Sequence, residues 1–255
     1  MDILKKAMTS DKGAVLTAID ATELVSESMH RIQSWPSATV HLGQAMMAAL
    51  LLESMSEKPD RGLDTEGNRK IEMNWHVRGP FGPLFVEADW KGHVRGTLLN
   101  PTSPITDLNS SLGTGILRVK RTRKETSEGI VRSTGEVGTD IVEYLEASEQ
   151  RKCGIGLSVE MEWDEACPEF PFRVKRAVGY LVDVIADVDE EKSNRLLYQW
   201  DEHMRQLGKL SEWELPGDRT LQMLRFLSGE KDPQIFFTHT LDFIVPVISQ
   251  EQKWL

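Results

Sequence analysis

The sequence of 255 residues predicts an α+β protein: a mixed α/β core of antiparallel β-sheets with packed helices, then a helical linker arm and a short tail. Helical periodicity in residues 20–55 is followed by short alternating runs, separated by Gly and Pro, in residues 70–163. A charged, helix-patterned segment follows. We place the core at residues 1–175, the arm at residues 176–235 and the tail at residues 236–255.

The first helical region depends on apolar residues that recur three or four positions apart. This spacing is shown by Leu42, Ala45 or Met46, Ala49 and Leu52, and Pro36 stands where the first turn of a helix tolerates proline. The polar residues 53–69 predict a loop.

Alternating apolar and polar residues predict the strands of the core. One such region runs from Lys70 to Leu99, and two more follow Gly115 and Gly129. A helix is expected next, with Asp140 and Glu143 forming a capping box at its start. The last strand of the region spans Ile155–Trp163.

The arm begins after a short apolar run, Tyr180 to Ile185. Acidic residues then mark a helix start, and one apolar helical face follows it. A second short helix, from Leu221 to Leu227, should end at Gly229. The apolar face of the first arm helix consists of Leu196, Leu197, Trp200, Met204 and Leu207.

Charge and hydropathy argue against a nucleic-acid-binding protein and against a membrane protein. The net charge of −10 argues against nucleic-acid binding, which needs positive charge to displace counterions. No apolar segment with a cleavage site follows Met1, and the most apolar run, Ala45 to Leu52, is far shorter than the roughly 20 residues that span a bilayer. We therefore expect a cytoplasmic protein that binds neither membrane nor nucleic acid.

No catalytic motif emerges, and we expect no enzyme. The six histidines lack metal-binding spacing, and neither a nucleophile elbow nor a phosphate-binding loop occurs. The dense basic cluster from Arg118 to Lys124 fits a solvated hairpin tip or, alternatively, an anion or partner contact.

Only two cysteines occur, Cys153 and Cys167, and neither belongs to a CxxC pair. A zinc site of four cysteines is therefore excluded. An extended segment between them would hold the two sulfur atoms too far apart for a disulfide. A turn would be needed to bring them together, and in a cytoplasmic protein we expect free thiols.

The glycine pattern of the core resembles the heat shock protein 33 family. Gly79-Pro80-Phe81-Gly82-Pro83-Leu84 is followed in the family's order by Gly92-His93-Val94-Arg95-Gly96. Further matching pieces are Leu42-Gly43-Gln44-Ala45, Leu112-Gly113-Thr114-Gly115, Glu128-Gly129-Ile130-Val131, Ser148-Glu149-Gln150, Tyr180-Leu181-Val182 and Asp232-Pro233-Gln234.

The resemblance implies an ATP-independent holdase chaperone, whose core binds unfolding proteins (its clients) when oxidation expels zinc and the linker unfolds. The sequence departs from the family where that zinc module would begin. Val245 and Val247 stand where the first two thiols would be, the second pair has no counterpart, and Asp183 and Ala186 replace other linker residues. We therefore expect no zinc, no other cofactor and no redox switch.

Three hypotheses follow: a holdase without thiol control, a static module for one specific partner, and, least favoured, an enzyme on the same scaffold. The sequence leaves the formation of a homodimer open. Our candidates for client contact or for covering the core are apolar residues of the arm and tail: Leu196, Leu197, Trp200, Met204, Phe236, Phe237, Phe243, Ile244, Val245 and Val247.

Overall fold

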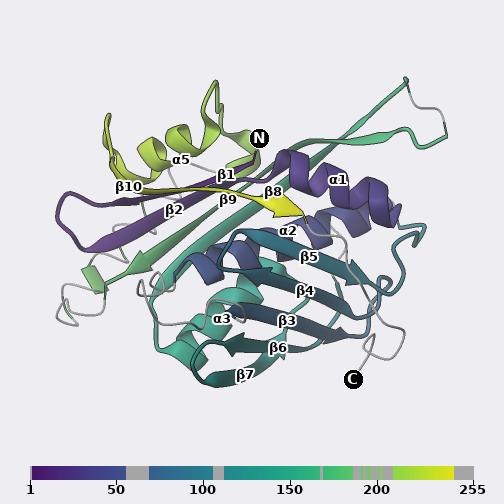
Figure 1. Cartoon of the computed structure of the whole chain (residues 1–255), viewed down its shortest axis with the longest axis horizontal. Helices are drawn as coiled ribbons and strands as arrows, with labels where there is room; N and C mark the ends of the chain where they lie inside the picture. Colours follow the sequence, from purple (N-terminus) through teal and green to yellow (C-terminus); the bar gives the residue numbers. More distant parts are fainter. Residues whose placement is uncertain are drawn as a thin grey trace.

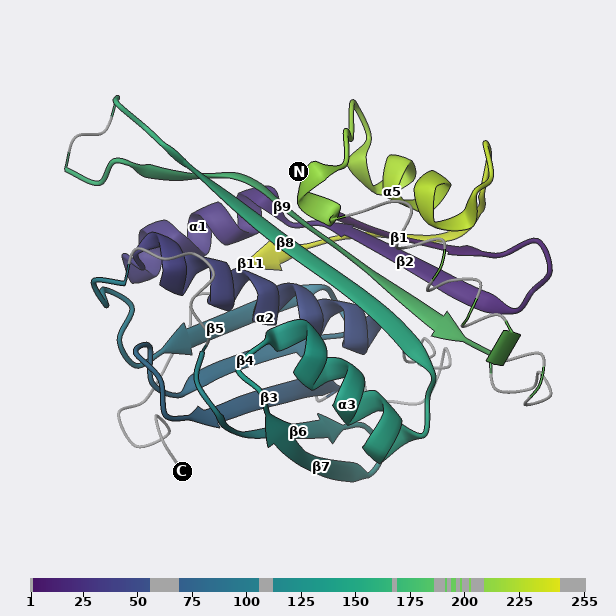
Figure 2. The same ribbon diagram turned by 180° about the vertical axis from the view of Figure 1, so that it is seen from behind.

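A computed structural model describes residues 2–55, 69–105, 112–166, 169–185 and 209–243, with residues 191, 194, 195, 198 and 202 between the last two ranges. These residues form two β-sheets with a layer of helices between them and a further helix on the outer side of one sheet (Figure 1). The view from behind shows the same four layers (Figure 2).

The six-stranded sheet has the order β11-β5-β4-β3-β6-β7. Its strands are antiparallel except that β11 pairs with β5 in parallel. The strands span β3 (Lys70–Val77), β4 (Leu84–Asp89), β5 (His93–Leu98), β6 (Gly115–Thr122), β7 (Thr126–Ser133) and β11 (Asp242–Phe243).

The five-stranded sheet has the order β10-β1-β2-β9-β8 and is antiparallel throughout. Its strands span β1 (Ile3–Met8), β2 (Ala14–Asp20), β8 (Cys153–Trp163), β9 (Phe172–Val184) and β10 (Gln234–Thr240).

Three helices fill the space between the sheets: α1 (Thr22–Ile32), α2 (Pro36–Ser54) and α3 (Val137–Glu149). A fourth, α5 (Arg219–Ser228), lies on the outer face of the five-stranded sheet, next to the short 3₁₀ helix η1 (Leu210–Glu212). Within the described part of the chain, no helix is both long and apolar enough to cross a membrane.

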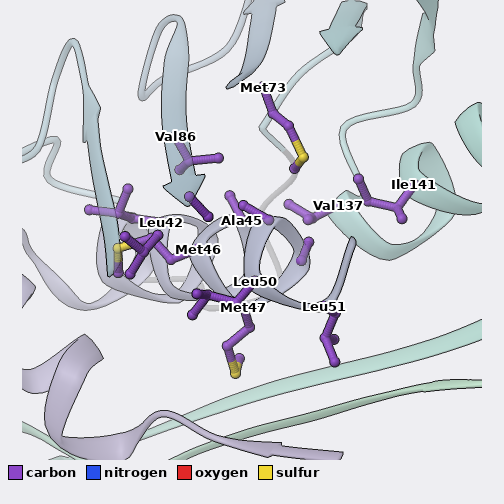
Figure 3. Close-up of a cluster of buried hydrophobic side chains, with 14 of the residues drawn as sticks. Leu42, Ala45, Met46, Met47, Leu50, Leu51, Met73, Val86, Val137 and Ile141 are labelled. Atoms are coloured by element: carbon purple, nitrogen blue, oxygen red, sulfur yellow. The ribbon is translucent and has the colours of Figure 1, made fainter. Parts of the chain in front are cut away.

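Helix α2 is the centre of the core. Sixteen of its nineteen residues are buried, because it packs against β3, β4 and β5 on one side and against β8 and β9 on the other. Figure 3 shows Leu42 and Ala45 directed towards Val86, whereas Met47 and Leu51 point the opposite way. A helix with apolar side chains all around its axis is stable only when it is enclosed in this way.

The close packing of α2 requires a glycine at one position. A Cβ atom on Gly43 would lie 2.8 Å from Val25 of α1 and 3.0 Å from Val159 of β8. Glycine costs a helix about 1 kcal/mol relative to alanine, and here it allows close contact with two neighbouring elements.

The structure confirms the predicted fold class and most of its elements. Strands β1 and β2 were not anticipated, and the greater part of the expected loop at 53–69 lies outside the described residues. The predicted boundaries at 175/176 and 235/236 fall inside β9 and β10. The division into core, arm and tail therefore stays a prediction. Strand β9 crosses the first of its boundaries, and strand β10 crosses the second.

The predicted capping box at Asp140 is wrong. Helix α3 begins at Val137, one turn earlier, and Asp140 lies fully buried within it. Its carboxylate accepts hydrogen bonds from Trp75 Nε1 (3.0 Å), Ser133 Oγ (2.6 Å), and both Oγ1 (2.8 Å) and the backbone N–H (2.7 Å) of Thr134. Asp140 thus joins α3 to β3 and to the end of β7.

A residue distant in sequence caps helix α1. Ala21 stands at the N-cap position and has no side chain that could accept a hydrogen bond. The carboxylate of Asp2 accepts instead from the backbone N–H groups of Glu23 (3.0 Å) and Leu24. Burial nevertheless raises the pKa of Asp2 to about 6, outweighing the lowering effect of these bonds.

Replacing Asp140 by Asn should lower the free energy of unfolding by about 2–3 kcal/mol, because the amide nitrogen cannot accept from the buried donors. Urea denaturation measures this change. Glu143→Gln serves as the matched control and should change stability by less than about 0.5 kcal/mol. A comparable loss in both variants would restore the capping-box interpretation.

The pH dependence of stability tests the cap of α1. The folded-state pKa of Asp2, about 6, lies above the ordinary value of 3.8. The protonated carboxyl therefore contributes stability that is present below pH 3.8 and is lost as the pH rises through about 6. The free energy of unfolding of Asp2→Asn, measured by chemical denaturation, should therefore rise relative to that of the wild type as the pH increases from about 4 to about 7. A fall of this difference over the same interval would contradict the raised pKa of Asp2.

Candidate functional site

The outer face of the five-stranded sheet is apolar and is covered by a separate segment of the chain. In β2, Thr17 and Ile19 are on the side of α2, whereas Leu16 and Ala18 belong to a second hydrophobic cluster on the opposite side. We call the sheet residues of this cluster the covered face: Ala7, Ala14, Leu16, Ala18, Val178, Tyr180 and Val182.

Residues 209–228, which we call the cover, contain η1 and α5 and supply the other half of this cluster. Six of their apolar side chains are at most 8% exposed and so are as deeply buried as the core itself, whereas Leu221 and Phe226 are partly buried. The buried cover residues are Leu210, Trp213, Leu215, Met223, Leu224 and Leu227.

Local sequence explains why α5 forms and which side it buries. Asp218 accepts a hydrogen bond from the backbone N–H of Leu221 (3.1 Å) and so caps the helix, and Gly229 ends it in the left-handed conformation with φ 66°. Met223, Leu224 and Leu227 lie on one side of the helix and pack on the sheet. The small residues Ala7, Ala14 and Ala18 of the covered face permit close approach.

An aromatic column connects the sheet to the cover. The ring of Tyr180 is stacked on Trp213, with centroids 5.8 Å apart and planes within 1°, and Trp213 meets Phe226 edge-on at 5.4 Å. Tyr180 lies across from Gly156 of β8, where a Cβ atom would come within 2.3 Å of the ring. Burial raises the pKa of Tyr180 to about 12, so its hydroxyl stays neutral at physiological pH.

Charged groups hold the ends of the cover. Lys5 of β1 forms an ion pair with Asp218, and Arg219 Nη1 lies 3.0 Å from a carboxylate oxygen of Asp20. Arg176 of β9 donates to the backbone carbonyls of Ser211 (2.7 Å) and Trp213 (2.8 Å). The site thus has an apolar centre and a polar rim, as protein interfaces do.

The three residues proposed from the sequence that the structure describes lie outside the covered face and the cover. Phe236 is 54% exposed on β10, Phe237 is half-buried against the core beside Lys6, and the backbone of Phe243 pairs with Val94. Outside the described residues lie Leu196, Leu197, Trp200, Met204, Ile244, Val245 and Val247. The role proposed for these residues stays a prediction.

Strands β10 and β11 join the cover's C-terminal side to both sheets. Strand β10 pairs with β1. After a single intervening residue, β11 pairs with β5. Between them Leu241 is buried, and its N–H donates to the carbonyl of Asp2 (3.2 Å). The chain that leaves the cover is therefore fixed to the edge of each sheet.

Basic residues of β6 form ion pairs within the protein. Arg118 pairs with Glu128 and Lys120 with Glu72, across neighbouring strands. Arg121, by contrast, is 3% exposed; it contacts Glu149 (2.7 Å) and donates to the carbonyl of Leu52 at the C-terminal end of α2. The expectation of a solvated tip is therefore wrong for Arg121, because strand alternation turns this residue inward.

The sulfur chemistry of the described residues is limited. Cys153 is a free, buried thiol, and burial raises its pKa to about 12, so it is not a ready thiolate ligand or nucleophile. The described ranges contain no group of three or more His, Cys, Asp or Glu residues arranged to hold a metal ion. Cys167 lies outside the described residues. The residues of the described ranges therefore do not fit a zinc–thiolate site.

Comparison with known proteins relates this architecture to one family. The family model described as "Hsp33 protein" matches residues 2–247. The 33 kDa chaperonin of Enterococcus faecalis is 29% identical over 247 residues, covering 92% of this chain and 76% of that protein. The 33 kDa chaperonin of Bacillus subtilis is 27% identical over 257 residues, covering 96% and 81%.

A solved structure shares the fold. The crystal structure of the 33 kDa chaperonin (heat shock protein 33 homolog) from Thermotoga maritima aligns with a TM-score of 0.77 at 20% identity, covering 98% of this chain and 81% of that one. Because the family model spans nearly the whole sequence, the chain belongs to the Hsp33 protein family.

Proposed function

We propose that this protein is an ATP-independent holdase chaperone that binds unfolding proteins on the covered face after the cover lifts. Membership of a chaperone family supports the general function. A second apolar sheet face, separate from the α2 core, is buried by a contiguous segment of twenty residues, and this arrangement supports binding on the covered face. The absence of a phosphate-binding loop motif from the sequence supports independence from ATP.

Opening of the cover is a local event in this proposal. The covered face and cover form a cluster separate from the one around α2, so their contacts can break while the inner core stays packed. Segments of this kind open at lower free energy than the whole protein unfolds. Opening would expose large apolar side chains on both surfaces, which suits unfolding proteins that also expose apolar residues.

We further propose that thiol chemistry does not control the opening and that no zinc takes part. The sequence has two cysteines, fewer than a four-thiolate site requires, and the raised pKa of Cys153 opposes its oxidation. Valines occupy positions 245 and 247, where the family resemblance would place thiols. Heat is then the simplest trigger, since it weakens a small local unit before the whole core.

A static interaction module is the alternative. The capped helix α5, the aromatic column and the charged contacts at the rim favour a firmly docked cover. A stable cover would make the outer surface, not the covered face, the site for one specific partner. Isolation of one stoichiometric partner from cells, in place of many unfolding ones, would favour this function.

The direct test is suppression of aggregation. The full chain should keep a thermally unfolding test protein soluble without ATP, and treatment with peroxide or dithiothreitol should leave this activity unchanged. Failure to suppress aggregation at stoichiometric excess would refute the holdase proposal. Activity that appears only after oxidation would refute the absence of thiol control.

Gly156→Ala should promote opening, because the new methyl group must displace the ring of Tyr180 and with it the stack on Trp213. Gly154→Ala is the matched control on the same strand, since a Cβ atom there meets nothing within 4 Å. We expect Gly156→Ala alone to increase binding of an apolar dye below the melting temperature and to lower the temperature at which aggregation is suppressed. Equal behaviour of the two variants would exclude this role of the aromatic column.

A further inference from the structure

Arg176 connects the sheet to the backbone of the cover. Its Nη2 donates to the carbonyl of Ser211 (2.7 Å) and its Nη1 to that of Trp213 (2.8 Å). Both carbonyls lie at the turn of η1, just before the chain continues towards α5. One planar guanidinium therefore forms hydrogen bonds with two backbone carbonyls of the cover.

Glu160 fixes the orientation of this guanidinium. It is directly opposite Arg176 in the β8–β9 pair and accepts from Arg176 Nε (2.8 Å) and from its Nη2. The side chain of Arg176 is only 13% exposed, so its hydrogen bonds are largely shielded from water. Charge-assisted bonds in such surroundings are stronger than those between neutral groups.

A β-bulge places Arg176 on the side of the cover. The register shifts here: Glu160 is opposite Arg176, but Met161 is opposite Val174, which leaves Lys175 as an additional residue in β9. Val174 therefore packs into the core around α2, although it is only two positions from Arg176. In a regular strand without the bulge, Val174 and Arg176, two positions apart, would share one face of the sheet.

The neighbouring ion pair makes no such contact with the cover. Arg173 pairs with Glu162 at 2.6 Å on the same two strands, and it is 57% exposed. The two pairs have the same chemistry and differ in what else they contact, so they provide a matched comparison.

We propose that Arg176 is a positioning residue that keeps the site closed: an autoinhibitory clip, oriented by Glu160, whose release opens the cover while the core stays folded. This inference rests on the proposed function, because it assigns the regulation of the covered face. The clip consists of a guanidinium, a carboxylate and two carbonyls, and it holds no thiol. It therefore supplies a closing contact that oxidants do not address.

The test compares Arg176→Met with Arg173→Met in the full chain by hydrogen–deuterium exchange. In Arg176→Met, amides of residues 209–228 should exchange about ten- to a hundred-fold faster, while those of α2 stay protected. Dye binding below the melting temperature should rise in parallel, and Arg173→Met should match the wild type. Glu160→Gln should give a smaller effect that disappears in the Arg176→Met background, because Glu160 acts through Arg176.

Unchanged exchange of residues 209–228 in Arg176→Met would overturn the inference. Equal acceleration of α2 would also overturn it, because Arg176 would then stabilise the whole fold and not the cover. An opened cover without improved suppression of aggregation would leave the clip intact as a finding and count against the holdase function.

Discussion

The burial of helix α2 on all sides is the constraint on which the rest of the structure depends. With sixteen buried residues among nineteen, this helix needs apolar partners around its whole circumference. The two sheets supply them, with Gly43 allowing close contact with α1 and β8. Cations from elsewhere in the chain meet its C-terminal carbonyls: Lys6 bonds to Ser54 O and Arg121 to Leu52 O. The last turn of α2 itself has no basic residue.

The five-stranded sheet differs from the six-stranded one in what its outer face carries. The outer face of the six-stranded sheet carries ion pairs along and across its strands, in which Lys70 of β3 contacts Glu72 of the same strand and Glu87 of β4. The five-stranded sheet carries Leu16, Val178 and Tyr180 there, and these side chains require a cover. One sheet thus combines a face that belongs to the core with an apolar face that a separate segment covers, and the proposed holdase function requires both.

Regular patterns made much of the fold predictable from the sequence. Periodicity located α1, α2 and the last helix, where Gly229 ends α5 as expected, and alternation located β3 to β8. Strands buried on both faces lack alternation, so the apolar run of β2 was missed and that of β9 was recognised only as an apolar segment. This continuous apolar character was the one signal of the covered face. The environments of Asp140, Arg121 and Arg176 depend on contacts between distant strands, which local spacing does not encode.

We propose that the cover opens as a unit before the core and that the exposed sheet face then binds unfolding protein. Hydrogen–deuterium exchange of the wild-type chain, followed while the temperature is raised with and without an unfolding client, tests it most directly. We expect α5 to lose protection at a lower temperature than α2, and the client then to restore protection to β2 and β9 but not to α5. Simultaneous loss of protection in α5 and α2, or client-induced protection confined to other strands, would contradict it.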